Sequence, residues 1–312
     1  MIRLVTKASV AGMLAIAATL AVAGVAPAAF PGRNGKIAFR GAPRAAKNSI
    51  YTIRPDGTHR KRLTPVPTTE TNQAYDPAFS ANAKKIVYER VVGTIDNPNY
   101  EIYKMRANGS HKVRVTNTET NEFDPAFSPN GHRIVFTRRL PGPGYEIFTI
   151  RADGSHERRL TDDHASDAEP SFSPSGARIV FNRNFDLAIM RADGSHQHRI
   201  TRRSSLESGP DFSPSGRWIV FNRSTNRGSS YQIYEIRTNG THLRRLTTPK
   251  FGVDDGNPVF SPNGKKIAFQ SDGRHGIGGP RIYVMRRDGT HIRRLHTGKG
   301  LGAMAPSWGV RP

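Results

Sequence analysis

Apolar and polar residues alternate along most of this chain in short segments that are separated by turn-forming residues. One stretch contains four such segments in a row: FDPAFS (123–128), HRIVFTR (132–138), YEIFTIR (145–151) and HERRLT (156–161). Period-two alternation rich in β-branched and aromatic residues is typical of β-strands. The turn sequence 128–131 (SPNG) separates the first two segments, and Asp153-Gly154 is typical of a hairpin between the last two. The pattern predicts four consecutive antiparallel strands, of which the charged last segment is the outer edge.

This four-strand unit recurs along the chain. Its clearest mark is the hairpin phrase IRPDGTH (53–59), MRANGSH (105–111), IRADGSH (150–156), MRADGSH (190–196), IRTNGTH (236–242) and MRRDGTH (285–291). Successive copies begin about 40 to 52 residues apart, which is the spacing of four-stranded propeller blades. No pattern with the helical period of 3.6 residues follows residue 29. We therefore predict an all-β fold, a six-bladed β-propeller of four-stranded antiparallel blades.

The two ends of the repeat array predict how the ring closes. The array starts with a second strand, KIAFR (36–40), which has no inner strand before it. It stops after an inner strand, Ala305 to Gly309, which lacks the other three. We expect this last strand to join the first three, because closure removes the free sheet edges. Trp308 should then lie beside Ile37.

Residues 1–28 have a different character from the rest. Arg3 and Lys7 precede an uncharged stretch, and Ala26-Pro27-Ala28 forms a small-x-small site. This is the pattern of a secretory signal peptide with cleavage after Ala28. A retained membrane anchor is the alternative, because about 18 uncharged residues can span a bilayer. We thus expect two parts, a signal peptide (1–28) and the propeller (29–312), and a periplasmic, cell-wall-associated or extracellular location.

Composition narrows the partners. The chain contains no cysteine, which excludes disulfides and thiolate metal sites, and its net charge is +22. Such a surface favours polyanions, and outside a cell these are wall polymers, acidic polysaccharides or anionic lipids rather than nucleic acid. The plainer interpretation is that arginines decorate solvated outer strands. We expect a monomer that binds no nucleic acid.

The repeat residues resemble the TolB-type β-propeller, whose units carry a P-x-[FW]-S-P-[DN]-G turn and an I-Y-x-M-x-x-D-G-S strand and hairpin. The resemblance covers residues 34–309 in all six units. It implies a six-bladed fold, an exported protein and, more weakly, a role in an envelope system in which a lipoprotein partner binds near the central channel. The α/β domain that precedes the propeller in TolB proteins has no counterpart in the sequence given.

The connections from outer to next inner strand and from second to third strand vary most, as in 64–75, 90–100, 116–123 and 271–281. They should share one face of the ring, where variable loops usually carry recognition. On that side we predict a binding site at the channel mouth from the residues before the inner-strand prolines: Asp76, Asp124, Glu169 and Asn257. The three acids suit a cationic peptide segment or, less well, a metal ion. The plainer interpretation is a structural role, in which the carboxylates accept backbone N–H groups where the loop enters the strand.

A second candidate surface is the arginine that precedes each hairpin, namely Arg54, Arg106, Arg151, Arg191, Arg237 and Arg286. Together they form a possible polyanion rim, although pairing with the turn Asp and Asn residues explains them as well. The six turn histidines stand too far apart for one zinc ion, whose ligands lie about 2 Å from it.

Catalytic motifs are missing. The sequence has no G-x-S-x-G elbow, no H-E-x-x-H and no phosphate-cradling glycine loop. We expect no cofactor, no metal and no catalytic residues. The leading hypothesis is an exported, non-catalytic binding propeller for an envelope protein or peptide. The alternatives are a wall polymer-binding protein that uses its arginine periphery and, from a third class, a polysaccharide lyase or hydrolase.

Overall fold

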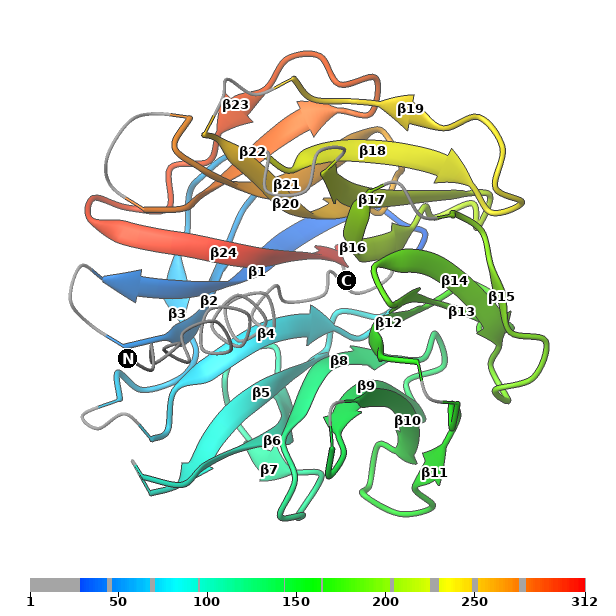
Figure 1. Ribbon diagram of the computed structural model, residues 1–312. Helices are drawn as coiled ribbons and strands as arrows, with labels where there is room; N and C mark the ends of the chain where they lie inside the picture. Colours follow the sequence, from blue (N-terminus) through cyan, green and yellow to red (C-terminus); the bar gives the residue numbers. More distant parts are fainter. Residues whose placement is uncertain are drawn as a thin grey trace, which may run out of the picture.

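A computed structural model describes residues 29–311, apart from 44–46, 68–70, 95, 143, 164, 203–204, 225–229, 249–251 and 275–278. The predicted signal peptide lies outside the described residues. Those residues form 24 strands in six four-stranded sheets, arranged around a centre as the blades of a propeller (Figure 1). The predicted all-β, six-bladed fold is confirmed. No helix among the described residues is long and apolar enough to cross a membrane.

Each blade runs from an inner strand at the centre to an outer strand at the edge. The inner strands are β24 (Leu301–Val310), β4 (Ala74–Phe79), β8 (Glu122–Phe127), β12 (Asp167–Phe172), β16 (Leu206–Phe212) and β20 (Asp254–Phe260). The second strands are β1 (Asn34–Pro43), β5 (Lys85–Gly93), β9 (Arg133–Arg139), β13 (Arg178–Arg183), β17 (Trp218–Ser224) and β21 (Lys266–Asp272).

The third and fourth strands complete the blades. The third strands are β2 (Ser49–Ile53), β6 (Pro98–Arg106), β10 (Tyr145–Arg151), β14 (Asp186–Arg191), β18 (Gln232–Arg237) and β22 (Arg281–Arg286). The outer strands are β3 (Lys61–Arg62), β7 (Val113–Arg114), β11 (Arg158–Arg159), β15 (His198–Arg199), β19 (Arg244–Arg245) and β23 (Arg293–Arg294). Blades are numbered 1 to 6 in chain order, and blade 1 contains β24 with β1 to β3.

The ring closes as the ends of the repeat array predict. The last strand, β24, pairs antiparallel with β1, and Trp308 lies opposite Ile37. This pairing places the C-terminal strand at the centre and leaves three N-terminal strands to finish the blade (Figure 1). The inner strand β24, at the end of the chain, therefore closes the ring by completing blade 1.

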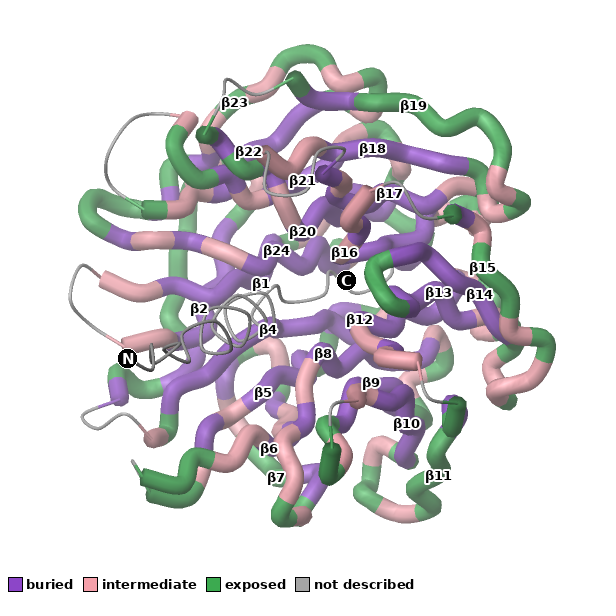
Figure 2. The backbone as a smooth tube through the Cα atoms, in the orientation of Figure 1, coloured by how far each residue is buried: buried purple, intermediate pink, exposed green. Residues whose placement is uncertain are grey.

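The core lies between blades. A buried cluster joins Ala78 and Ile102 of blade 2 to Phe127 and Phe136 of blade 3, and comparable clusters fill the other joints. The repeated inner-strand aromatics contribute to these clusters, and all six are buried: Phe79, Phe127, Phe172, Phe212, Phe260 and Trp308. Burial falls from the inner strands to the outer edges (Figure 2). Inter-blade packing, rather than a single central core, thus makes the ring rigid.

Two details differ from the sequence prediction. The outer segment 156–161 contributes only Arg158–Arg159 to the ladder, because His156 has a φ of 53° and turns the chain away from β10. The predicted loop 90–100 is largely a hairpin, in which β5 continues to Gly93 and β6 begins at Pro98. Cross-strand pairs such as Val91 with Tyr100 lengthen this hairpin beyond those of the other blades.

Candidate functional site

The residue before each inner-strand proline adopts a left-handed backbone. These residues are Asp76, Asp124, Glu169, Gly209, Asn257 and Ala305, with φ between 43° and 62°. At each of them the pairing between inner and second strand shifts register, as in a β-bulge. A bulge redirects a side chain that would otherwise follow the alternation of its strand. The same left-handed β-bulge therefore recurs in all six blades.

In blades 2 and 3 this device brings three carboxyl groups together. Asp76, Glu89 and Asp124 each offer an oxygen atom, and these oxygens all lie within 4.8 Å of one another. Their exposed fractions are only 3%, 2% and 8%. We call these three residues the acidic cluster. Glu169 of blade 4, which is 8% exposed, continues the acidic side of the channel.

Hydrogen bonds from the bulges hold the cluster in place across the blade joints. The N–H of Asp124 donates to Glu89 Oε1 at 2.7 Å, and the hydroxyl of Thr137 donates to Asp124 Oδ2 at 3.2 Å. The N–H of Glu169 donates to Thr137 Oγ1 at 3.0 Å, and the N–H of Gly209 to Glu169 Oε2 at 2.7 Å. Asp76 Oδ1 is buried and has no hydrogen-bond partner among the described residues. Hydrogen bonds thus hold Glu89 and Asp124 in place, and Asp76 keeps one unsatisfied acceptor.

The carboxyl groups resist ionisation. Burial raises the pKa of Asp76, Glu89 and Asp124, and for Glu89 the neighbouring Asp76 and Asp124 raise it further. Burial also raises the pKa of Glu169 to about 7, and the Asp76 charge adds to this effect. Desolvated carboxylates that repel one another favour the protonated form. A cation placed among these carboxyl groups would offset the repulsion and stabilise their ionised forms.

Arg40 is the nearest counter-charge on the described part of the channel wall. It is 4% exposed, and its charge lowers the pKa of Asp76 and of Glu89. Its NH2 group donates to Met304 Sδ at 2.9 Å, and its guanidinium lies 5.2 Å from the centre of the Tyr75 ring. Arg40 thus acts on two of the four acidic groups, so the acidic side keeps a surplus of carboxyl groups.

The opposite side of the channel uses neutral residues in the same places. Gly209 and Ala305 have no polar side chain, and Asn257 occupies the bulge of blade 6. The N–H of Asn257 donates to Asn222 Oδ1 at 3.3 Å, and the N–H of Ala305 donates to Gln270 Oε1 at 2.9 Å. An amide oxygen therefore makes the bond that a Glu89 oxygen makes to Asp124. The backbone device does not require a carboxylate.

An aromatic ladder lies beside the acidic cluster on the loop side. It runs from Tyr75 through Tyr100 and Phe123 to Tyr145, with ring centroids 5.8, 5.1 and 6.3 Å apart. These residues stand at the ends of β4, β6, β8 and β10 that adjoin the variable connections. Tyr75 is buried, and the other three are partly exposed. The ladder offers partly exposed ring surface next to a negatively chargeable site.

The structure thus brings together three of the four residues predicted for the channel mouth. Asp76, Asp124 and Glu169 converge, whereas Asn257 lies on the neutral side. All four are nearly buried, because six inner strands converge here and the bulges turn these residues inward. The prediction of an acidic arc from consecutive blades therefore agrees with the geometry. Whether the arc binds a partner stays a prediction.

Glu89 and the aromatic ladder were missed from the sequence. Glu89 lies in a second strand and directly follows Tyr88. From alternation alone, a polar residue at that position is expected to face solvent. Aligning the six units shows the missed signal, since a polar residue always follows the aromatic: Arg40, Glu89, Thr137, Asn182, Asn222 and Gln270. The ladder carries no such mark, because its members occupy strand ends whose length varies between blades.

The six candidate rim arginines are all exposed; five end the third strand of their blade, and Arg54 directly follows β2. They spread around the periphery and do not converge. Arg54, Arg151, Arg191 and Arg286 help to lower the pKa of the turn aspartates Asp56, Asp153, Asp193 and Asp288, whose largest causes are hydrogen bonds from the following Thr or Ser. These four arginines thus act on the aspartates of their own turns, and whether the rim binds a polyanion stays a prediction.

Arginines of the outer strands have a different role from the rim. Arg114 pairs with Glu101 at 2.7 Å, and Arg159 pairs with Glu146 at 2.9 Å. Both acids are buried on third strands, and each also accepts a hydrogen bond from a buried threonine, Thr116 or Thr161. These pairs fasten outer strands to their blades. Part of the high arginine content is thus structural.

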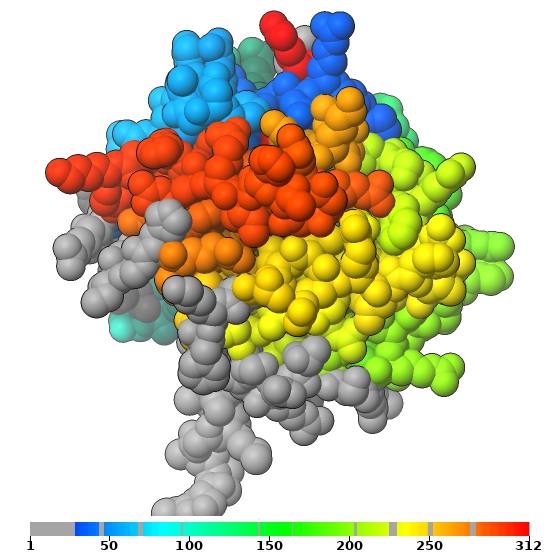
Figure 3. Space-filling model, turned by 90° about the horizontal axis from the view of Figure 1, so that it is seen from above, coloured from blue at the N-terminus to red at the C-terminus, as the bar shows by residue number. Residues whose placement is uncertain are grey.

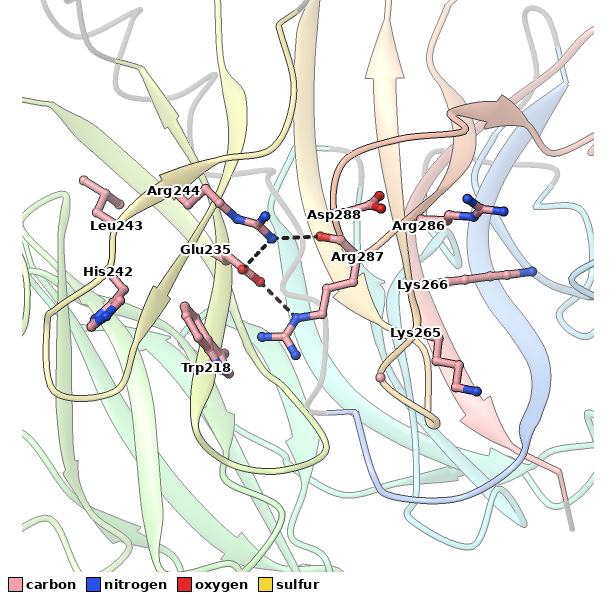
Figure 4. Close-up of a pocket in the computed structure, with 11 residues that line it drawn as sticks. Trp218, Glu235, His242, Leu243, Arg244, Lys265, Lys266, Arg286, Arg287 and Asp288 are labelled. Carbon is pink, nitrogen blue, oxygen red and sulfur yellow. Dashed lines mark hydrogen bonds and ion pairs between the residues drawn. The ribbon is translucent and has the colours of Figure 1, made fainter.

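A basic groove lies where blades 5 and 6 meet at the edge of the ring, and Figure 3 shows these two blades side by side. Its volume is about 1060 Å³, and its lining includes Trp218, Arg244, Lys265, Lys266, Arg286 and Arg287. Glu235 pairs with Arg244 at 2.8 Å and with Arg287 at 3.2 Å (Figure 4). The Arg287 guanidinium lies 5.0 Å from the Trp218 ring centre. Lys265, Lys266 and Arg286 form no ion pair within the part of the chain that the structure describes.

Comparison with known proteins agrees with this geometry. Residues 74–186 match the family model described as the TolB beta propeller domain. The structure of TolB from Acinetobacter baumannii superposes with a TM-score of 0.73 at 22% identity, over 96% of this chain and 71% of that one. A provisionally named TolB from Agrobacterium tumefaciens gives 0.63 at 21%, over 83% of this chain and 88% of that one. The chain thus shares the propeller fold of these TolB structures, and residues 74–186 resemble the TolB propeller in sequence.

The fold also occurs in enzymes. An oligogalacturonate lyase in complex with manganese gives a TM-score of 0.54 at 14% identity, over 85% of this chain and 74% of that chain. At this identity the likeness concerns the fold alone. A search of curated proteins finds no match. Function must therefore be argued from the sites themselves.

Proposed function

We propose that the chain is an exported, non-catalytic binding module that holds an envelope protein or peptide on its loop face. A cationic side chain of the partner enters the acidic cluster, and neighbouring aromatic or apolar side chains pack on the aromatic ladder. The likeness to TolB propellers supports a binding role in general. The observation that carries the proposal is the acidic cluster itself, because the bulges of blades 6 and 1 make the same backbone contacts with amide oxygens.

Charge supports this assignment. The chain carries a net charge of +22, yet the described loop side of its channel concentrates Asp76, Glu89, Asp124 and Glu169. A lysine or arginine would meet three carboxyl groups whose ionised forms are otherwise unfavourable. Adjacent rings such as Tyr100 and Phe123 attract cations through their faces, which is worth about 0.5–2 kcal/mol. The acidic cluster and the aromatic ladder together favour a cationic segment that is flanked by apolar groups.

Binding should release protons, because the raised pKa of Glu169, about 7, keeps this group partly protonated at neutral pH until a cation arrives. Affinity should therefore rise between pH 6 and pH 8. This direction separates the proposal from polyanion binding through arginine, which keeps its charge throughout that range. It also gives the experiment a readout that does not depend on naming the partner first.

The test is capture from the cell envelope of the source organism by the mature protein, at low and high salt. Wild type should retain a defined protein or peptide that Glu89→Gln together with Asp124→Asn loses by at least about tenfold, which corresponds to about 1.4 kcal/mol. Arg106→Gln, on the rim, is the matched control and should retain it. Equal capture by the acid-neutralised protein would refute the proposal.

The basic groove supports a second candidate function, the binding of an anionic wall polymer. Lys265, Lys266 and Arg286 line it without ion pairs to described acids, so their charges can meet an anionic polymer. Affinity for polygalacturonate should fall steeply with salt and drop in Lys265→Gln/Lys266→Gln. If polygalacturonate binding does not depend on salt, or if the variant binds as well as wild type, the groove is not the polymer site. Release of unsaturated or shortened sugars from the polymer would instead point to an enzyme.

A further inference from the structure

The segment that precedes the first strand is buried where the described chain begins. Ala29 has no exposed surface, and it packs in the core cluster with Val220 and Phe260 of blades 5 and 6. The N–H of Gly32 donates to the Pro262 carbonyl at 3.1 Å. Asn34 Oδ1 accepts the N–H of Asn263 at 3.2 Å. These contacts place Ala29 inside the joint between two blades rather than on the surface.

A buried acid, Asp211, meets Ala29 in this joint. It lies on β16, has no exposed surface, and its Oδ2 accepts the N–H of Phe260 at 2.9 Å. The carboxyl group also receives the backbone N–H of Ala29, while its Oδ1 has no hydrogen-bond partner among the described residues. Burial raises the pKa of Asp211 well above its usual range. No arginine or lysine forms an ion pair with it in the described parts of the chain.

The same position in the other blades is neutral. The corresponding inner-strand residues are Ala78, Ala126, Ser171, Val259 and Ser307. Ser307 Oγ accepts the N–H of Phe79 at 3.1 Å, which is the inter-blade bond that Asp211 makes to Phe260. A hydroxyl group therefore suffices for this bond. The negative charge of Asp211 exceeds what the joint requires, and an isolated buried carboxylate is costly unless it is paired.

We propose that cleavage after Ala28 creates the partner for Asp211, and that the new α-ammonium group of Ala29 forms a buried ion pair with it. Two independent observations meet at one residue. The small-x-small pattern Ala26-Pro27-Ala28 predicts cleavage before Ala29, and the nitrogen of Ala29 is the one that contacts the odd acid. Processing and final docking of the N-terminus are thereby coupled.

The chemical step is hydrolysis of the Ala28–Ala29 peptide bond by a peptidase that processes exported proteins. Water supplies a hydroxyl to the Ala28 carbonyl carbon and a proton to the Ala29 nitrogen, and the amine takes up a further proton at neutral pH. One amide N–H then becomes an ammonium group with three donors. These donors can satisfy both Asp211 oxygens, and the added charge balances the carboxylate.

The test is a double-mutant cycle on the mature chain. One protein begins at Ala29, a second carries one extra glycine before it, and both are also made with Asp211→Asn. The extension should lower the melting temperature of the wild-type chain by about 5 °C, because it removes one partner of a buried pair. In the Asp211→Asn background the extension should cost less than about a third of that. Equal losses in both backgrounds would overturn the pairing.

Asp255→Asn is the matched control, since Asp255 is a buried acid of the next inner strand that pairs with Arg274. In that variant the extension should keep its full effect. If Asp211→Asn does not fold, acylation of the folded mature wild-type protein decides instead. Mass spectrometry should then find the α-amino group protected while exposed lysines react, and rapid α-acylation would overturn the proposal. So would an intact mass of the exported protein that places its first residue elsewhere than Ala29.

Discussion

The two sides of the central channel are built on the same backbone and differ in charge. In blades 2 to 4 the bulge residues are Asp76, Asp124 and Glu169, whereas in blades 5, 6 and 1 they are Gly209, Asn257 and Ala305. Both sides satisfy the bulge N–H groups from the neighbouring blade. Asn257 and Ala305 donate to amide oxygens, so this backbone bond does not require a carboxylate, although Gly209 donates to the carboxylate of Glu169. This difference supports a functional role for the carboxyl groups.

The largest effect should be a loss of stability as pH rises. Groups whose pKa is raised in the folded state bind more protons when folded, so their stabilisation is present below the unfolded pKa, near 4, and is lost as pH passes the folded pKa. Glu169, with a pKa of about 7, should alone contribute roughly 3 kcal/mol to the difference between pH 4 and pH 8. Urea unfolding at pH 5 and pH 8 measures most of this change.

Glu169→Gln sharpens that measurement, because it removes the titrating group while keeping an acceptor for the Gly209 N–H. Its free energy of unfolding should vary less with pH than that of wild type. A wild-type stability that stays level or rises from pH 5 to pH 8 would contradict the assignment of raised pKa values to the acidic side.

Placing an acid on the neutral side should reproduce the loss of stability at high pH. Asn257 is 1% exposed, and Asn257→Asp adds a buried carboxyl group to the neutral side without changing side-chain size. We expect a loss of about 2–3 kcal/mol at pH 8 and a much smaller loss at pH 5, from the cost of burying a charge. Thermal melts at both pH values check it. A pH-independent loss would instead indicate a packing effect.

Truncating the aromatic ladder should affect binding more than folding. Tyr100→Ala removes a partly exposed ring between Tyr75 and Phe123, so the cost in stability should be about 1–2 kcal/mol. Capture of the envelope partner should nevertheless fall about tenfold. Tyr51→Ala is the control, since this buried ring stacks on Phe39 in blade 1 and should reduce stability rather than capture. The reverse ranking would remove the ladder from the site.

Divalent cations should have the smallest effect. The acidic cluster offers three carboxylate oxygens within 4.8 Å, but a calcium ion takes six to eight oxygen ligands. Millimolar Ca²⁺ or Mn²⁺ should shift the melting temperature by less than about 1 °C at pH 7. A rise of several degrees that Glu89→Gln abolishes would turn the site from a receptor for a cationic side chain into a metal site.

Features that repeat in every unit could be predicted from the sequence, and features that occur only once could not. The blades and the ring closure follow from phrases that repeat along the chain, and the position before each inner-strand proline repeats with them, so spacing and alternation predict these features. Glu89 could have been found by aligning the units, but its proximity to Asp76 depends on a bulge in a different strand. The basic groove joins Trp218 of one blade to Lys266 of the next, and such contacts follow only from three-dimensional packing. Asp211 stands out only once its neutral counterparts are seen to make the same bond.

The most direct test of the central claim is the stability of the double variant Asp76→Asn/Glu89→Gln at pH 8. Both substitutions keep side-chain size and an oxygen acceptor while removing two of the three clustered charges. If the fold does not need these carboxyl groups, the variant should unfold at a higher urea concentration than wild type. A variant less stable than wild type at that pH would show that the acids serve the architecture, and the proposed receptor for a cationic group would lose its basis.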